Sequence, residues 1–349
     1  MSEKIRVGVV FGGRSGEHEV SLASARGIMG ALDPDRFDVT PIGITREGRW
    51  LVEGEPMAQL TAGVEPSAGN APLALQSRPS GPISRVDVIF PVLHGPFGED
   101  GTIQGMFEMA DLAYVGSGVA GSAVGMDKIL MKGLFLAAGL PVLPYVALSR
   151  SEWEREPEAV LDRIEERLDY PMFVKPANLG SSVGISKCAD REELGEGLAL
   201  AARYDRRLLV EQGLERPREI EVAVLGNDEP KASVAGEIVP HEQFAFYDYE
   251  SKYTADQADL LIPAPLGEET ADRVRRLALE AFQVLDCAGL ARVDFLLDRE
   301  TGDLYLNELN TMPGFTPISM YPQVFAASGV AYEELLDVLV TTALQSPRR

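Results

Sequence analysis

The segment "LYLNELNTMPGF", residues 304–315, constrains this chain more than any other stretch of its sequence. Read as a β-strand, it places alternate side chains on opposite faces. One face then carries Leu304, Leu306, Glu308 and Asn310, and the other carries Tyr305, Asn307 and Leu309. A carboxylate among buried leucines is costly unless it is paired or bound to a cation. The strand therefore predicts a positively charged partner on the face of Glu308.

The preceding segment supplies a second strand with the same kind of pattern. "ARVDFLLD" and "DLYLNELN" are joined by "RETG", which predicts a β-hairpin. Pairing brings a guanidinium, Arg292, onto one face with three oxygen donors, Asp294, Glu308 and Asn310. Such oxygens suit a hard cation, Mg²⁺ above all. The alternative is a solvated sheet face with surface ion pairs, but the apolar flanks and "TMPGF" favour a metal site.

Composition limits the partners of the chain. Its 349 residues allow two or three domains, and 45% hydrophobic with 25% charged residues is ordinary for a soluble globular protein. A net charge of −22 argues against nucleic acid, though not against one small anion in a basic pocket. We see no signal peptide and no apolar run of membrane-spanning length. Because no such run is present, we expect no membrane partner. Two distant cysteines, Cys188 and Cys287, fit a reduced, cytoplasmic protein.

The first third of the chain predicts a small parallel-sheet domain. Strands "IRVGVVFGG", "FDVTPIGI" and "VDVIFPVLHG" alternate with a helix after the first glycine turn, a βαβ-like order. Residues 46–85 are interpreted as an irregular surface excursion because they are rich in Gly, Pro, Ser and Ala.

The rest of the chain mixes helices with short strands. We expect helices near 126–139, 153–168, 190–203, 267–285 and 332–345, and strands at "PMFVKP", "RLLVEQGL" and "REIEVAVLG". Residues 240–260 follow neither period and are long for a loop, which indicates a functional lid.

Three glycine-containing segments are ligand-site candidates. In "KPANLGSSVG", residues 175–184, backbone N–H groups and serine hydroxyls can cradle phosphate beside Lys175, although such a loop can also be an ordinary turn. "HGPFGEDGTIQG" follows a buried strand, so His94 is a candidate ligand contact, and Glu99, Asp100 or Thr102 can cap the next helix. Glu17 in "GGRSGEHEV" either binds a ligand or stabilises a helix dipole.

Seven motifs together resemble one family. "GGRSGEHEVSL", "HGPFGEDGTIQG", "MDK", "KPANLGSSVG", "YDYESKY", "RVDF" and "NELNTMPGFTPISMYP" are similar to those of D-alanine–D-alanine ligases of the ATP-grasp superfamily, in family order over nearly the whole chain. The resemblance implies an α/β (α+β) ATP-grasp fold. It has a Rossmann-like domain at 1–120, a central subdomain at 121–211, and a C-terminal subdomain at 212–349 with the 240–260 lid. ATP would lie between two antiparallel sheets.

The resemblance also implies roles around the nucleotide. Asp294, Glu308 and Asn310 would bind Mg²⁺, with Mn²⁺ as a substitute, and Asn307 would lie beside the nucleotide with Glu308. The phosphates would contact Lys128, Lys175, Lys252 and the loop residues Gly180, Ser181, Ser182 and Val183. The adenine edge and ribose would contact Glu211, Gln212, Leu214 and Glu219, although an extra residue before Glu219 departs from some relatives.

For the amino-acid substrates, the resemblance places Glu17 at the ammonium of the first D-alanine, hydrogen-bonded with Ser181 and Tyr253. Ser319 and the Met320 N–H would bind the carboxylate of the second. Arg292 and the Gly314 N–H would stabilise the tetrahedral intermediate.

The implied reaction is ATP-dependent formation of D-alanyl-D-alanine through an acyl phosphate, for peptidoglycan synthesis in a bacterium, by a homodimer. A D-alanine–D-lactate ligase is the nearest competing activity, but "SKY" keeps the lid tyrosine that favours the dipeptide. The sequence is also compatible with another ATP-grasp carboxylate–amine ligase, and less so with a non-catalytic nucleotide-binding regulator.

Overall fold

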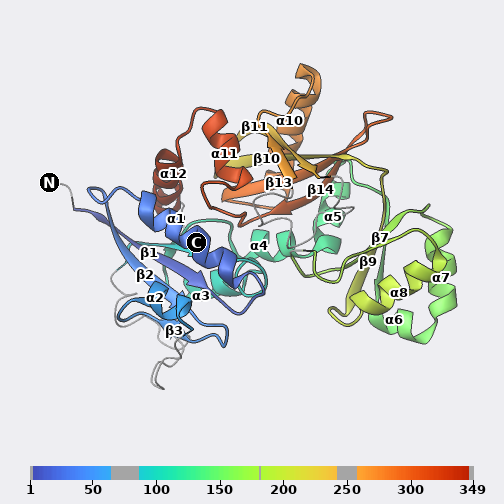
Figure 1. Ribbon diagram of the computed structural model, residues 1–349, viewed down its shortest axis with the longest axis horizontal. Helices are drawn as coiled ribbons and strands as arrows, with labels where there is room; N and C mark the ends of the chain where they lie inside the picture. Colours follow the sequence, from blue (N-terminus) through green and yellow to red (C-terminus); the bar gives the residue numbers. More distant parts are fainter. Residues whose placement is uncertain (1–2, 64–85, 181, 242–257, 346–349) are drawn as a thin grey trace.

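The computed structural model describes residues 3–63, 86–180, 182–241 and 258–345, which form three β-sheets flanked by helices (Figure 1). The first sheet has the order β3-β2-β1-β4-β5, and its strands are parallel except β3. They are β1 (Ile5–Gly12), β2 (Phe37–Ile44), β3 (Trp50–Leu51), β4 (Val88–Val92) and β5 (Ala113–Tyr114). The predicted parallel sheet is confirmed, and β4 is wholly buried, as a parallel strand covered on both faces should be.

Helices surround this sheet and link it to the rest of the chain. They are α1 (His18–Ala31), α2 (Pro56–Thr61), α3 (Thr102–Met109) and α4 (Val119–Met126). The interpretation of 46–85 as irregular was wrong for its described part, which holds β3 and α2. Pro56 starts α2, where a missing N–H costs nothing. Residues 64–85 lie outside the described residues.

The central sheet is antiparallel, with the order β6-β9-β7-β8. Its strands are β6 (Tyr145–Ser149), β7 (Met172–Pro176), β8 (Ser186–Cys188) and β9 (Arg207–Gln212), and its helices are α6 (Arg150–Arg155), α7 (Pro157–Glu165) and α8 (Arg191–Ala201). The single helix expected at 153–168 is wrong. A capping box of Ser149 and Glu152 begins α6, and Pro157 begins α7, so the chain breaks between them.

The third sheet is also antiparallel, with the order β12-β11-β10-β13-β14. Its strands are β10 (Arg218–Gly226), β11 (Lys231–Pro240), β12 (Ala258–Leu261), β13 (Gly289–Leu297) and β14 (Leu304–Asn310). Its helices are α10 (Glu268–Val284), α11 (Met320–Ala327) and α12 (Tyr332–Gln345), while α5 (Lys128–Ala137) lies beside β14. Two antiparallel sheets after a parallel one confirm the predicted ATP-grasp architecture.

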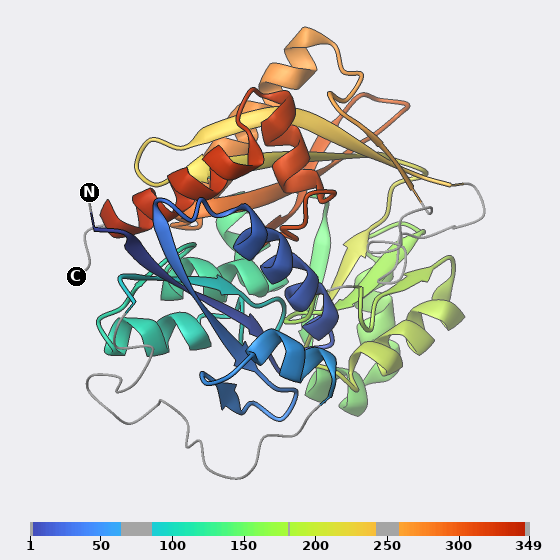
Figure 2. The same ribbon diagram turned by 60° about the vertical axis from the view of Figure 1, so that its left-hand side comes forward.

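The C-terminal helices join the first and third sheets through one hydrophobic core. Phe315 packs on Phe90 of β4 with ring centroids 6.0 Å apart, and on Tyr321 of α11 and Tyr332 of α12 at 5.4 and 5.7 Å. Figure 2 shows α12 lying beside α1, in agreement with their contacts. The end of the chain therefore fixes the parallel sheet against the third sheet. The boundaries near 120 and 211 stay a prediction.

A β-bulge interrupts β14 at Asn307. Asp294 pairs with Glu308, but Phe295 pairs with Leu306, so one extra residue lies between them. The expected strict alternation was wrong: Leu304, Leu306 and Leu309 enter the core, whereas Glu308 and Asn310 line a cavity on the other face. A bulge adds one residue to one strand and thereby exchanges its faces. The bulge therefore lets one strand bury leucines and also present an acid and an amide to the cavity.

Among the described helices, none combines the length and apolar character needed to cross a bilayer. The predicted lid at 240–260 falls almost wholly on residues 242–257, which are outside the described part of the chain.

We expect Gly121→Ala to destabilise the protein, because α4 passes very close to the end of α10 there. A Cβ on Gly121 would lie 2.7 Å from the Asp286 carbonyl oxygen and 3.0 Å from that of Leu285. Overpacking of this kind costs about 1–3 kcal/mol, measurable as a lower Tm. Gly195→Ala in α8 is the control, since its Cβ would meet only Trp153 at 4.0 Å. An equal response of both variants would contradict close packing at Gly121.

Candidate active site

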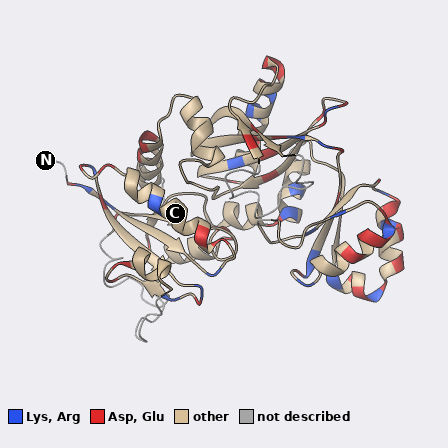
Figure 3. Ribbon diagram, in the orientation of Figure 1, with Lys and Arg blue, Asp and Glu red and all other residues tan. Residues whose placement is uncertain are grey.

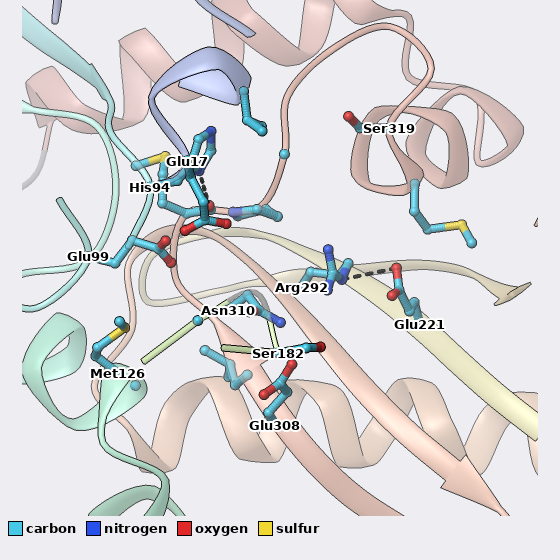
Figure 4. Close-up of a pocket in the computed structure, with 18 of the residues that line it drawn as sticks. Glu17, His94, Glu99, Met126, Ser182, Glu221, Arg292, Glu308, Asn310 and Ser319 are labelled. Carbon is cyan, nitrogen blue, oxygen red and sulfur yellow. Dashed lines mark hydrogen bonds and ion pairs between the residues drawn. The ribbon is translucent and has the colours of Figure 1, made fainter. Parts of the chain in front are cut away.

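A cavity of about 520 Å³ lies where the three sheets meet. Segments following β1 and β4 form one wall, the β7–β8 loop another, and the face of β10, β13 and β14 the floor; the start of α11 closes one end (Figure 4). Segments beyond the carboxyl ends of parallel strands are a common place for ligands in α/β folds. The lining includes Glu17, His94, Glu99, Lys128, Gly180, Ser182, Glu221, Arg292, Glu308, Asn310, Gly314, Ser319 and Met320.

The floor of the cavity is the hairpin face predicted from the sequence. The Arg292 guanidinium donates to both Asp294 oxygens, at 2.7 Å from Nε and 2.6 Å from Nη2. The Asn310 amide Nδ2 also donates to Asp294 at 3.0 Å. Pairing of Arg292 with Asn310 and of Asp294 with Glu308 sets this arrangement. The structure thus brings the four predicted hairpin residues together.

Sequence reasoning missed Glu221, the third carboxylate of this face. Glu221 pairs with Asp294 across β10 and β13, and its Oε2 lies 3.0 Å from Arg292 Nε. Burial alone would lower the pKa of Arg292, but the carboxylates of Asp294 and Glu221 raise it well above its usual value. Arg292 is therefore a fixed cation among acids. The alternation in "REIEVAV" could have revealed Glu221, since it shares a face with Glu219.

The donor set on the floor suits a hard cation. Asp294, Glu308 and Asn310 offer two carboxylates and an amide, and Mg²⁺ usually takes a few protein oxygens and completes its shell with water and phosphate. Among the described residues, no group of three or more His, Cys, Asp or Glu is placed to hold a metal by itself. The metal assignment therefore stays a prediction that depends on an amide and on ligands from outside the chain.

The wall opposite the floor carries Glu17 and His94. Glu17 is 8% exposed, and a Cβ on Gly95 or Gly180 would lie 2.8 or 3.5 Å from its Oε2, so two backbones approach this carboxylate closely. His94 Nδ1 lies 3.0 Å from the Met312 carbonyl, which only accepts, so Nδ1 carries the proton. Burial lowers the pKa of His94 although Glu17 opposes it. The neutral imidazole leaves Nε2 as an acceptor, without a hydrogen-bond partner in the described part of the chain.

Glu99 is a second acid of this wall, and the sequence had indicated it as a possible cap of the next helix. Its Oε1 accepts the Gly95 N–H at 2.5 Å and caps no helix; Asp100 accepts instead from the Thr102 N–H at 3.1 Å. Burial and the charge of Glu17 raise the pKa of Glu99 to about 8. Glu99 is therefore mostly protonated at neutral pH.

Lys128 reaches the cavity from the start of α5. Asp127 caps this helix, accepting from the Ile129 and Leu130 N–H groups at 3.1 Å, and is ion-paired with Arg207. The Lys128 ammonium donates to the Leu179 carbonyl at 2.5 Å, next to Gly180. This cation therefore lies at the base of the predicted phosphate loop.

Lys175 and Glu211 belong to a buried charge cluster beside the cavity. The Lys175 ammonium donates to Glu211 Oε2 at 2.6 Å, and Lys132 is ion-paired with the other oxygen. Glu211 is 1% exposed. Its side chain thus holds two lysines, and only its backbone is left for the adenine contact implied by the resemblance. Figure 3 shows basic positions on α5, whereas α6, α7 and α8 carry mixed charges.

The far end of the cavity is formed by the "TMPGF" loop and α11. Ser319 precedes α11 and its Oγ lies 2.8 Å from Thr316 Oγ1 and accepts the Thr316 N–H at 3.1 Å. Gly314 lies against Ser319, since a Cβ on it would be 3.2 Å from the Ser319 Oγ. Met320 packs over Gly236 of β11. A helix N-terminus with a hydroxyl suits a carboxylate.

The remaining predicted residues fall into two groups. Ser181, Lys252 and Tyr253 lie outside the described residues. Val183, Gln212, Leu214, Glu219 and Asn307 do not line the cavity. The Gln212 side chain instead bonds both ways with the Asp169 backbone at 2.7 Å, so a nucleotide contact by Gln212 would have to come from its backbone.

The parallel sheet, the two antiparallel sheets and the cavity between them define a protein of the ATP-grasp class. The sequence matches the family models for the D-ala D-ala ligase N-terminus over residues 6–117 and C-terminus over 134–341. It is 52% identical to the D-alanine–D-alanine ligase of Geobacillus thermodenitrificans, over 98% of this chain and 96% of that one. The chain belongs to the D-alanine–D-alanine ligase family.

Solved structures agree with this assignment. The VanG D-Ala:D-Ser ligase from Enterococcus faecalis superimposes with a TM-score of 0.85 at 35% identity, covering 98% of this chain and 100% of that one. The D-alanine–D-alanine ligase from Coxiella burnetii gives 0.82 at 37% identity, covering 98% and 94%.

We expect Glu99→Gln to stabilise the protein increasingly as pH rises. The folded pKa of about 8 exceeds the ordinary value of 4.5, so between these values the unfolded chain loses a proton that the folded chain keeps. The stability contributed by Glu99 is complete below pH 4.5 and is lost as pH rises through 8. Tm measured from pH 4.5 to 8.5 should favour the variant at high pH. Parallel curves would contradict a neutral Glu99. The control is Glu108→Gln, at an exposed position of α3.

Proposed function

We propose that this protein joins two D-alanines to D-alanyl-D-alanine at the expense of ATP, as its family does, for peptidoglycan precursors. One observation supports this assignment: a single cavity holds Glu17, Ser319 and Arg292. Glu17 can bind an ammonium, Ser319 offers a hydroxyl at a helix N-terminus, and Arg292 lies among the acids of the floor. These groups match the two ends of a zwitterionic amino acid and the anionic centre that forms between two of them.

In the first step, the carboxylate of the first D-alanine attacks the γ-phosphate of ATP, giving an acyl phosphate and ADP. Glu17 would bind the ammonium of the first D-alanine, and neutral His94 would accept a hydrogen bond from the substrate at Nε2. Lys128 and Lys175 would bind phosphate oxygens together with the backbone of the 180–184 loop. Mg²⁺ held by Asp294, Glu308 and Asn310 would offset the charge that repels an anionic nucleophile from a polyphosphate.

In the second step, the amine of the second D-alanine attacks the acyl phosphate carbonyl. Its carboxylate would lie at Ser319 and the Met320 N–H. Arg292 and the Gly314 N–H would bind the oxyanion of the tetrahedral intermediate, and phosphate then leaves. Arg292 is suited to this because Asp294 holds it at two points and no reorganisation is needed when charge develops. The 240–260 segment would exclude water from the acyl phosphate.

We infer a cytoplasmic protein that binds neither nucleic acid nor membrane, and a homodimer, as the resemblance implies. The net charge of −22 supports the lack of nucleic-acid binding.

Purified protein with ATP and Mg²⁺ should release ADP and phosphate with D-alanine and form the dipeptide. D-Lactate, offered with D-alanine as second substrate, should compete poorly at neutral pH, because the chain keeps Lys252 and Tyr253 in "SKY". D-Serine is offered in a parallel reaction. A coupled ADP assay with mass spectrometry of the products decides this. Dominant depsipeptide or D-alanyl-D-serine would overturn the choice of second substrate, and no turnover with any of them would overturn the proposal.

Glu308→Ala should reduce turnover by at least about 100-fold while the protein stays folded, because a lost metal ligand forfeits several kcal/mol of charge stabilisation. The Mg²⁺-dependent rise in Tm with ADP should also shrink. Glu300→Ala, an exposed acid in the turn of the same hairpin, is the control and should behave as wild type. Normal activity of Glu308→Ala would show that the metal assignment is wrong.

A further inference from the structure

The outer edge of β14 is covered by α5 and the loop that follows it. β14 is the last strand of its sheet, so its outward N–H and C=O groups need partners elsewhere. The Leu306 N–H donates to the Pro141 carbonyl at 2.7 Å, and the Leu309 N–H to Met131 Sδ at 3.3 Å. Between them, the Lys132 ammonium donates to the Asn307 carbonyl at 2.9 Å. Lys132 therefore holds the residue at which the strand bulges.

The same ammonium belongs to the charge cluster beside the nucleotide loop. Lys132 is 1% exposed and pairs with one Glu211 oxygen, while Lys175 takes the other at 2.6 Å. Two ammonium groups share one carboxylate, which leaves a net charge of +1. Only 1% of the Lys132 side chain is exposed, against 13% for Lys175, so Lys132 is closed to a ligand in the cavity. An ammonium this deeply buried is retained only with full pairing.

We propose that Lys132 is a positioning residue for the ligase reaction, acting on both halves of the nucleotide site at once. Its bond to the Asn307 carbonyl keeps the bulge that directs Glu308 and Asn310 into the cavity. It also pairs with one oxygen of Glu211. The negative charge of Glu211 is then shared by two lysines, and Lys175 is not fully neutralised and can still attract phosphate. The inference rests on the proposed function and adds to it a residue that touches neither substrate nor metal.

Loss of the Lys132 charge should have two separable effects. Glu211 would be left to Lys175 alone, the cluster would become neutral, and Lys175 would attract phosphate less. The Asn307 carbonyl would be left unsatisfied, and the bulge would lose its anchor. The first effect concerns nucleotide affinity, and the second concerns the alignment of the hairpin face and hence turnover.

The test compares Lys132→Met with Lys132→Met/Glu211→Gln, which removes both charges, and with Lys231→Met, which removes an exposed lysine at the start of β11. Calorimetry of Mg·ADP binding without D-alanine measures affinity, and the ADP assay measures kcat and the KM for D-alanine. Lys132→Met should weaken Mg·ADP binding by at least about tenfold, because a charge-assisted bond is lost from a buried cluster. The double variant should recover most of the affinity but keep a lowered kcat. Lys231→Met should match wild type.

Unchanged Mg·ADP affinity and kcat in Lys132→Met would overturn the proposal. An affinity loss that the double variant does not recover would overturn the charge-sharing argument. If the single variant does not fold, the double variant decides, since it removes Lys132 and Glu211 together and leaves only the more exposed Lys175 ammonium. Normal kcat there would overturn the positioning role. Binding of Mg·ADP needs no amino acid, so these results stay distinct from failure of the protein to ligate D-alanine.

Discussion

The bulge at Asn307 is the constraint on which the site depends. Without it, the alternation of β14 would place Glu308 and Asn310 on the same face as Leu304 and Leu306, inside the core. One extra residue lets the first half of the strand bury leucines and the second half present oxygens. Burying a carboxylate in that core would cost far more than the loss of one ladder position. The bulge therefore separates a folding surface from a chemical one within seven residues.

A second constraint brings the parallel sheet against this hairpin. The "TMPGF" loop leaves β14 directly, and its Met312 carbonyl bonds His94 while Phe315 packs on β4. The loop that carries Gly314 is thus fixed from both sides. Aromatic packing around Phe315 therefore helps to hold the parallel sheet, and with it the Glu17 wall, against the third sheet. Close packing of this kind lets a site hold its geometry before a ligand arrives.

Much of this was predictable from the sequence, for identifiable reasons. The hairpin, the parallel sheet and the helix at 332–345 follow from period and turn residues. The sequence placed Glu308 on the face of Leu304 and Leu306, which is wrong, because a bulge without glycine leaves no local signal in the sequence. The alternation of residues in β10 could have predicted Glu221, although no sequence motif marks it. Lys132 could not be predicted, because its partners Glu211 on β9 and Asn307 on β14 lie 79 and 175 residues away, and only tertiary packing brings them to α5.

The electrostatics of the cavity explain why its parts depend on one another. Glu17, Glu221, Asp294 and Glu308 line or adjoin it, while Arg292 is bound by two of them and Lys128 by a backbone carbonyl. Burial and, after it, the charges of Glu17 and Glu308 raise the pKa of Glu99 to about 8. A polyphosphate could not enter such a field alone. In the proposed function, cations would accompany the polyphosphate, and the cluster of Lys132, Glu211 and Lys175 would supply part of that compensation.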